Sequence, residues 1–178
     1  MTTSGPTSPA LRFAPLAEPA LVALLDKDLA RASALVGVEL TDYFVTDRAI
    51  WVWEMRIGQL RADPEDARWI ARAAVADPEG VVVGMAGFHG QPDERGMVEI
   101  SYSVDPAHRR RGYARAMLRE LLRWAATEPA VGVVRATISP GNEASLATLS
   151  GFGFTEIGEQ WDDIDGLELI FEVSADDG

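Results

Sequence analysis

The chain has 178 residues and a formal net charge of −12, with 47% hydrophobic and 25% charged residues. This length and composition predict a single soluble domain, and the acidic balance argues against a protein that binds nucleic acid through a basic surface. The absence of cysteine excludes disulfides and thiolate chemistry, and the presence of only two histidines argues against a zinc site.

The chain ends differ in composition from the rest. The first residues have neither the basic nor the apolar region of a signal peptide, and no apolar run approaches the roughly 20 residues of a membrane span. We therefore expect a cytoplasmic protein. Residues 1–9, rich in Ser, Thr and Pro, predict a disordered tail, residues 10–173 a single domain, and residues 174–178 a frayed acidic tail.

The N-terminal part predicts one strand followed by two helices. Residues 11–14 have the length and composition of a short strand. From Glu18, apolar residues at helical spacing continue as far as Ala32 and indicate one helix. Thr46 is a candidate N-cap for a second helix, in which the same spacing continues to Leu60.

The rest of the chain alternates between strands and helices. Residues 69–76 and 81–88 flank a short turn and predict a hairpin, and residues 97–104 predict a further strand. The clearest helix covers residues 112–126, where the apolar positions form one stripe. A strand at 131–139 follows, then a short helix capped by Asn142, and finally a hairpin of two strands at 154–160 and 167–173. This order predicts an α/β domain with a mixed sheet.

A basic loop connects the strand at 97–104 to the clearest helix. Its residues Arg109-Arg110-Arg111-Gly112-Tyr113-Ala114 match the pattern Arg/Gln-x-x-Gly-x-Gly/Ala. Gly112 lets the backbone approach a phosphate without a side chain in the way, and the arginines add fork-shaped donors. The helix start adds unpaired N–H groups and the positive end of a dipole. The loop therefore predicts an anion site for phosphate, although it is neither a Rossmann fingerprint nor a P-loop.

Two motifs resemble those of the GNAT family of acyl-coenzyme A-dependent N-acyltransferases. The first covers residues 104–114, and the second contains Asn142, Ser145, Leu149, Gly153 and Phe154. The strand at 99–104 is most similar to the branch of RimJ/RimL-type acetyltransferases. The resemblance implies a mixed, mostly antiparallel sheet whose central parallel strands splay apart, flanked by helices.

The resemblance also implies a coenzyme site. Acetyl-coenzyme A would lie where the parallel strands splay, as the acyl donor and without a metal. Its pyrophosphate would contact the N–H groups of residues 110–115, and the backbone of residues 102–104 would pair with the pantetheine. The residues assigned to coenzyme binding on this basis are Tyr102, Ser103, Val104, Arg109, Arg110, Arg111, Gly112, Tyr113, Ala114, Arg115 and Asn142.

Acyl transfer to an amine needs a proton acceptor for the amine and a proton donor for the thiolate. Glu99 is the candidate base, acting through water, unless it is only the polar side of a half-exposed strand. Many family members have Tyr at the position of Leu149, where it protonates the thiolate. Because this chain has Leu there, that role cannot be assigned to Leu149. Ser145 is the candidate that hydrogen-bonds the coenzyme sulfur. His89 either lines the acceptor pocket or makes a structural hydrogen bond.

These features predict an N-acetyltransferase that moves an acetyl group from acetyl-coenzyme A to a primary amine by direct attack in a ternary complex. The acceptor would be a protein N-terminus or a small amine, selected by residues 43–60 and 160–167. The alternative is an acyl-coenzyme A sensor of the same fold with little activity. A nucleic-acid module using the arginines is a third reading, disfavoured by the net charge. A second copy of the chain is a candidate partner, whereas nucleic acid and membranes are not expected.

Overall fold

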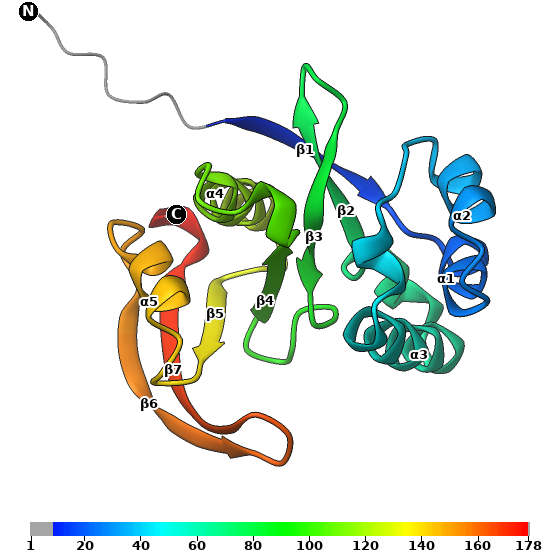
Figure 1. Cartoon of the computed structure of the whole chain (residues 1–178). Helices are drawn as coiled ribbons and strands as arrows, with labels where there is room; N and C mark the ends of the chain where they lie inside the picture. Colours follow the sequence, from blue (N-terminus) through cyan, green and yellow to red (C-terminus); the bar gives the residue numbers. More distant parts are fainter. Residues whose placement is uncertain (1–8, 178) are drawn as a thin grey trace, which may run out of the picture.

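A computed structural model describes residues 9–177 (Figure 1). The predicted disordered tail lies outside the described residues, except for Pro9. In chain order, the strands and helices are β1 (Ala10–Pro15), α1 (Glu18–Leu25), α2 (Leu29–Val36), α3 (Asp47–Ala62), β2 (Arg72–Asp77), β3 (Val82–Phe88), β4 (Met97–Val104), α4 (Tyr113–Ala126), β5 (Val133–Ile138), α5 (Glu143–Leu149), β6 (Thr155–Asp162) and β7 (Gly166–Ser174). The α/β class predicted from the sequence is confirmed.

One seven-stranded sheet forms the centre of the molecule, in the order β1-β2-β3-β4-β5-β7-β6. Every pair of neighbours is antiparallel except β4 and β5, which are parallel. The predicted mixed, mostly antiparallel sheet is therefore confirmed, with its one parallel pair near the middle.

The two parallel strands diverge along their length. β4 and β5 pair only from Met97–Val133 to Glu99–Arg135. Beyond that point β4 stays paired with β3 to its last residue, and β5 stays paired with β7. The backbone of β4 after Glu99 therefore has no partner on the β5 side, which confirms the predicted splay and leaves polar groups available to a ligand.

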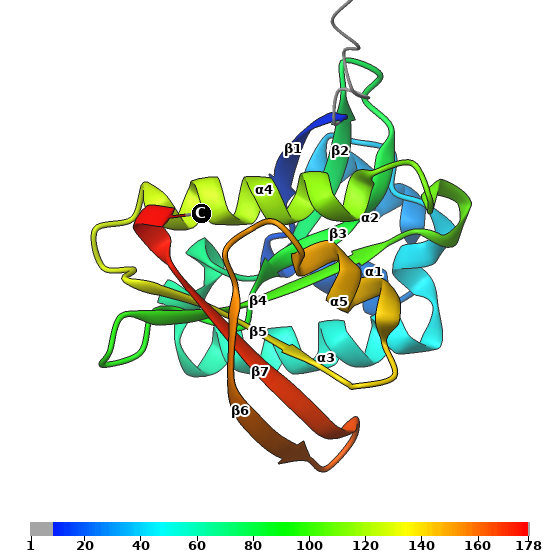
Figure 2. The ribbon, with the colours of Figure 1, turned by 90° about the vertical axis from the view of Figure 1, so that its left-hand side faces the viewer.

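The helices lie in two groups. Figure 1 shows α1, α2 and α3 gathered on one side of the molecule and α4 and α5 on the other. In Figure 2, α4 runs along the sheet with α5 beside it. The apolar stripe that predicted α4 is buried at Met117, Leu118, Leu121, Leu122 and Ala125, whereas its first member, Ala114, is only partly buried. No helix within residues 9–177 is both long and apolar enough to cross a membrane.

The start of α3 has the predicted cap and an unpredicted neighbour. Thr46 Oγ1 accepts a hydrogen bond from Ala49 N at 3.3 Å. Trp53, which is 1% exposed, donates its indole N–H to Phe44 O at 2.8 Å and stacks on the Phe44 ring. These contacts attach the 3₁₀ turn Asp42–Val45 to α3. The same turn also contacts the end of β4, through Tyr43 and Ser103.

Two expectations about the elements are wrong. The single helix expected from Glu18 is two helices, because the chain takes a left-handed conformation at Lys27 (φ 57°) and Asp28 caps α2 by accepting from Arg31 N at 3.0 Å. The fold also extends beyond residue 173. β7 includes Ser174, and the buried Ala175 donates from its backbone N to Gly132 O at 3.1 Å, so residues 174 and 175 belong to the domain rather than to a frayed tail.

Candidate active site

A cavity of about 590 Å³ lies between the end of β4, the start of α4 and α5. Every residue predicted to bind the coenzyme lines this cavity except Arg111, which is exposed and does not contribute. The lining residues are Tyr102, Ser103, Val104, His108, Arg109, Arg110, Gly112, Tyr113, Ala114, Arg115, Asn142, Ala144, Ser145 and Thr148. Residues separated by 40 positions in the sequence therefore converge on one site, as the two motifs predicted.

The first turn of α4 presents backbone donors to this cavity. Gly112 is the N-cap, and its φ of +83° is a conformation that L side chains rarely adopt. The first helical hydrogen bond runs from Ala116 N to Gly112 O at 3.1 Å. The N–H groups of residues 113–115 therefore have no acceptor within the helix and stand at the positive end of its dipole.

The lining of this cavity is basic although the chain is acidic. Arg109, Arg110, Arg115 and His108 all contribute to it, and none of the described lining residues is Asp or Glu. The buried Nδ1 of His108 has no hydrogen-bond partner among the described residues. Free helix amides, arginines and an unpaired buried nitrogen all suit a diphosphate. The residues present therefore fit a coenzyme that carries a diphosphate group.

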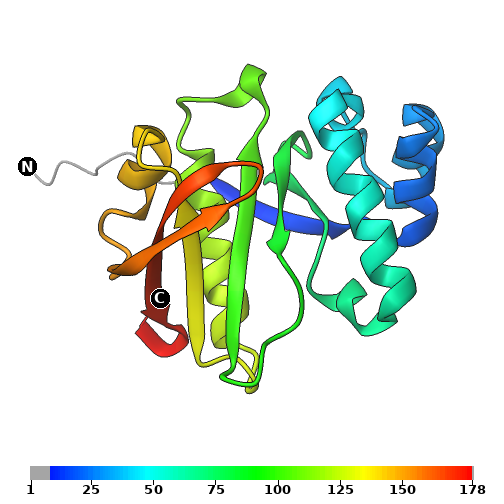
Figure 3. The ribbon, with the colours of Figure 1, turned by 90° about the horizontal axis from the view of Figure 1, so that it is seen from below.

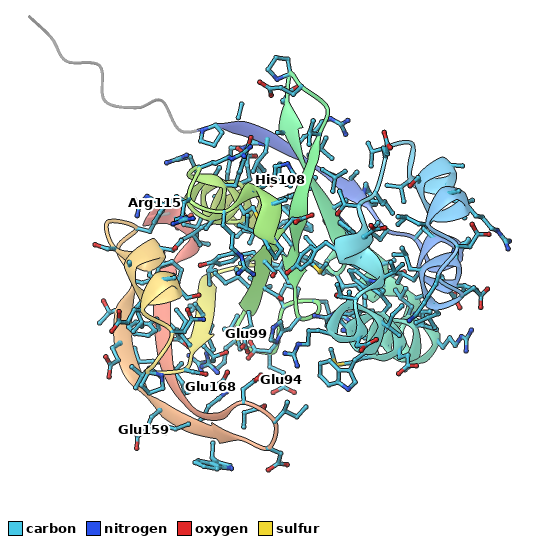
Figure 4. The ribbon with its side chains drawn as sticks, in the orientation of Figure 1. Glu94, Glu99, His108, Arg115, Glu159 and Glu168 are labelled. Atoms are coloured by element: carbon cyan, nitrogen blue, oxygen red, sulfur yellow. The ribbon has the colours of Figure 1, made fainter. Side chains whose placement is uncertain are left out.

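Arg115 has a second task, which sequence reasoning did not foresee. Its guanidinium donates to Thr148 O at 3.1 Å and to Ser150 O at 2.8 Å, at the C-terminal end of α5. It also lies 4.7 Å from the centre of the Phe152 ring, over which Arg119 is placed as well. Arg115 thus ties α5 to α4 and fixes the width of the cavity between them. Figure 4 shows Arg115 and His108 on the α4 side of the molecule.

The end of β4 is held in place by the 3₁₀ turn before α3. The hydroxyl groups of Tyr43 and Ser103 are hydrogen-bonded to each other, and Thr41 Oγ1 donates to Asp105 Oδ2 at 2.8 Å. Both contacts join segments that are far apart in the sequence, so no local pattern marked Tyr43 or Thr41. They fix the backbone at Ser103, where the coenzyme is expected.

A second cavity, of about 800 Å³, lies between α3, the diverging strands and the tip of the β6–β7 hairpin. Both segments expected to select the acceptor, residues 43–60 and 160–167, contribute to its lining. Those contributions are Arg48, Trp51, Val52, Met55, Arg56 and Gln59 from α3, and Asp162, Ile164 and Asp165 from the hairpin. Figure 3 shows the hairpin reaching toward α3, and Arg48 Nη2 and Asp165 Oδ2 are 3.7 Å apart across that approach.

The two cavities meet at three residues, Tyr102, Asn142 and Ser145, which line both. Asn142 Oδ1 accepts from Ser145 N at 3.1 Å, so Asn142 caps α5 as predicted. Burial raises the pKa of Tyr102, which keeps its phenol protonated well above neutral pH. Leu149 is 5% exposed, belongs to the core and lines neither cavity. Groups bound in the two cavities would face each other at this junction.

Glu99 does not line the larger cavity but contacts two residues that do, His89 and Thr137. Its side chain is 20% exposed, accepts from Thr137 Oγ1 at 2.6 Å, and places Oε1 3.6 Å from His89 Nδ1. His89 is a lining residue, and so is Glu168, which Figure 4 shows near Glu99. The structure thus places the candidate base next to the cavity, with His89 beside it. Within residues 9–177, no cluster of His, Asp or Glu side chains could hold a metal ion.

Comparison with known proteins points to one family. Residues 18–155 match the family model described as the acetyltransferase (GNAT) domain. A curated relative, the uncharacterized N-acetyltransferase YjdG of Bacillus subtilis (strain 168), is 38% identical over 73 residues. The aligned part covers 41% of this chain and 44% of that protein, so it spans less than half of the relative.

Solved structures share the fold at low sequence identity. Mycobacterium smegmatis RimJ in complex with CoA-disulfide matches with a TM-score of 0.64 and 22% identity, covering 93% of this chain and 82% of that one. A spermidine N-acetyltransferase SpeG chimera from Vibrio cholerae and hSSAT matches with a TM-score of 0.65 and 12% identity, covering 93% and 95%. These likenesses concern the arrangement of the sheet and helices.

Proposed function

Because this chain belongs to the acetyltransferase (GNAT) family, we propose that it transfers the acetyl group of acetyl-coenzyme A to a primary amine within a ternary complex. One observation carries the proposal. A basic cavity with free helix amides and a larger cavity with carboxylates in its lining meet at Tyr102, Asn142 and Ser145. Direct transfer requires such a junction, because both reactants must be held in contact at the same time.

The coenzyme occupies the basic cavity in this proposal. The amides of residues 113–115 and the side chains of Arg109 and Arg110 hold its pyrophosphate, while the unpaired backbone of residues 102–104 contacts the pantetheine. When bound, acetyl-coenzyme A supplies the acetyl thioester. Arg111, which is exposed and does not line the cavity, contributes only to the local positive charge.

The acceptor amine enters the larger cavity and meets the thioester at the junction. One N–C bond forms, one C–S bond breaks, and the proton lost by the amine balances the proton gained by the thiolate. The negative charge of Glu99 favours removal of the proton from the amine on this side of the junction. In this proposal Ser145, which lines both cavities, hydrogen-bonds the sulfur.

A second candidate function is an acyl-coenzyme A sensor with little turnover. The observation in its favour is Leu149, which stands where many family members have the tyrosine acid and is buried in the core. Ser145 and Tyr102 are then the hydroxyl groups left at the junction.

Thiol release from acetyl-coenzyme A distinguishes the two functions. The panel of acceptors contains spermidine, named for one structural neighbour, and a short peptide with a free N-terminus. We expect thiol release above the acceptor-free background with at least one amine, and a product heavier by one acetyl group. Coenzyme binding, followed by calorimetry, without turnover on any amine would favour the sensor. Failure to bind acetyl-coenzyme A would contradict both functions.

Asn142→Ser is expected to weaken acetyl-coenzyme A binding while keeping the cap of α5. Serine is a good N-cap but lacks the amide that would reach the pantetheine, and losing one hydrogen bond of about 0.5–1.5 kcal/mol corresponds to roughly 2- to 10-fold. Asn142→Ala removes the cap as well and should lower the unfolding free energy by about 0.5–2 kcal/mol. Calorimetric titration and denaturant unfolding measure the two effects. If both variants bind acetyl-coenzyme A as the unchanged protein does, Asn142 caps α5 and does not contact the coenzyme.

A further inference from the structure

We propose that His89 is the group that takes the proton from the acceptor amine, and that Glu99 is the residue that positions it. This inference rests on the proposed acetylation at the same site. The two side chains differ in their access to the larger cavity. His89 lines the larger cavity, whereas Glu99 is not part of the lining and contacts two residues that are, His89 and Thr137.

The carboxylate and the imidazole are arranged as a pair. Glu99 Oε1 accepts from Thr137 Oγ1 at 2.6 Å and lies 3.6 Å from His89 Nδ1. The Glu99 side chain is 20% exposed and the His89 side chain 51%. A carboxylate at Nδ1 favours the tautomer with its proton on that nitrogen. Nε2 is then the unprotonated nitrogen of His89, a residue that lines the cavity.

Hydrogen bonds hold both the backbone N–H and the backbone carbonyl of His89. Its N–H donates to Glu99 O at 2.8 Å, and its carbonyl accepts from Arg56 Nη1 and Gln59 Nε2, each at 2.8 Å. Gln59 also donates to Asp66 Oδ2 at 2.8 Å. Arg56 and Asp66 are both 7% exposed, and burying charged groups is costly unless they are paired and hydrogen-bonded. This network, which is anchored by the buried Arg56 and Asp66, fixes His89 at the cavity wall, as a preorganised catalytic group requires.

Three charged groups face the imidazole, namely Glu99 from β4, Arg56 from α3 and Glu168 from β7. Partial desolvation of the half-exposed imidazole lowers the pKa of His89 below its ordinary value; Glu99 opposes this shift, Arg56 adds to it and Glu168 opposes it. A lowered pKa keeps the imidazole neutral at pH 7, which is the form that accepts a proton.

The proton transfer balances without any further reactant. As the N–C bond forms and the C–S bond of the thioester breaks, the amine proton passes to His89 Nε2 and the departing thiolate takes up one proton. The resulting imidazolium is stabilised by the Glu99 carboxylate and then releases its proton to water. Thr137 keeps the carboxylate turned toward the imidazole through its hydrogen bond to Oε1.

His89→Gln tests the catalytic role, with the amine that the unchanged protein acetylates in the thiol-release panel. We expect kcat/KM to fall roughly 100-fold, the size typical of losing a general base, and the acidic limb of its pH profile to disappear. Acetyl-coenzyme A binding should stay within about twofold, because His89 does not line the coenzyme cavity. Glu94→Gln is the control, since Glu94 is an exposed carboxylate that Figure 4 shows in the same region.

Glu99→Gln tests the positioning role by a readout that does not need turnover. The chain has two histidines, so the His89 imidazole signals in NMR spectra are identified by their loss in His89→Gln. Glutamine keeps an acceptor for Thr137 but removes the charge that raises the His89 pKa. The His89 pKa should therefore fall, and the acidic limb of kcat/KM should move to lower pH, whereas Glu94→Gln should change neither.

The outcomes separate this inference from the proposed function. If the protein acetylates an amine and His89→Gln retains its rate and pH profile, the role of His89 is overturned and the proposed function stands. An unchanged His89 pKa in Glu99→Gln would overturn the pairing. If the unchanged protein acetylates no amine in the panel, both the proposed function and the role of His89 are contradicted.

Discussion

Replacing Gly112 with glutamate is expected to weaken acetyl-coenzyme A binding by roughly 100-fold while leaving the fold intact, since one or two charge-assisted hydrogen bonds of about 1.5–3 kcal/mol each would be lost. Gly112 has a φ of +83°, and a Cβ there would lie 3.3 Å from Pro9 Cδ. The added carboxylate would stand at the first amides of α4 and occupy the donors that a phosphate needs. Calorimetric titration with acetyl-coenzyme A measures the loss.

The matched control is Gly37→Glu. Gly37 ends α2 with a φ of +79°, a Cβ there would meet nothing within 4 Å, and it lines neither cavity. The same substitution therefore imposes a similar backbone strain, about 1–2 kcal/mol for a left-handed residue, without approaching the α4 amides. Gly37→Glu should lose stability and keep coenzyme affinity. If both variants bind acetyl-coenzyme A alike, the assignment of the phosphate loop is wrong.

The anion loop at the start of α4 could be predicted from the sequence because its chemistry is local, whereas the coenzyme proposed for it was implied by the family resemblance. The strand, the basic loop and the helix start follow one another between residues 97 and 126, and each has its own pattern. The exception within the loop is Arg111. Its neighbours line the cavity, but the left-handed conformation at Arg110 (φ 58°) changes the direction of the chain just before it. The direction of a side chain in a turn depends on such dihedral angles, which residue types alone do not specify.

The larger cavity was predictable only in outline, because distant elements assemble it. Its two main segments were identified, but not the network that holds His89. One signal was available. Arg56 lies three residues after Trp53 and four before Leu60, which places it on the buried stripe of α3. A charged residue on a buried stripe needs partners, but the sequence does not reveal that they are His89 O and Gln59.

Gly84→Ala is expected to lower the free energy of unfolding by about 1–3 kcal/mol, the usual cost of overpacking. Gly84 in β3 pairs with Val104 in β4. A Cβ there would collide with Ser103 O and lie 2.8 Å from Met117 Cε and 3.0 Å from Val104 Cα. The Met117 side chain can adapt, but the carbonyl of Ser103 belongs to a paired strand and cannot turn away. The end of β4 must therefore move away from β3.

This displacement should also weaken coenzyme binding, because residues 102–104 form the end of β4 and line the basic cavity proposed to hold the coenzyme. Gly158→Ala is the matched control, since Gly158 is also a strand glycine but a Cβ there would meet nothing within 4 Å. It should be neutral or stabilise by about 0.4–1 kcal/mol, by reducing the entropy of the unfolded chain. Denaturant unfolding and coenzyme titration of both variants measure the two effects. If Gly84→Ala matches Gly158→Ala in both, close contact between β3 and β4 is not what holds the coenzyme-facing strand in place.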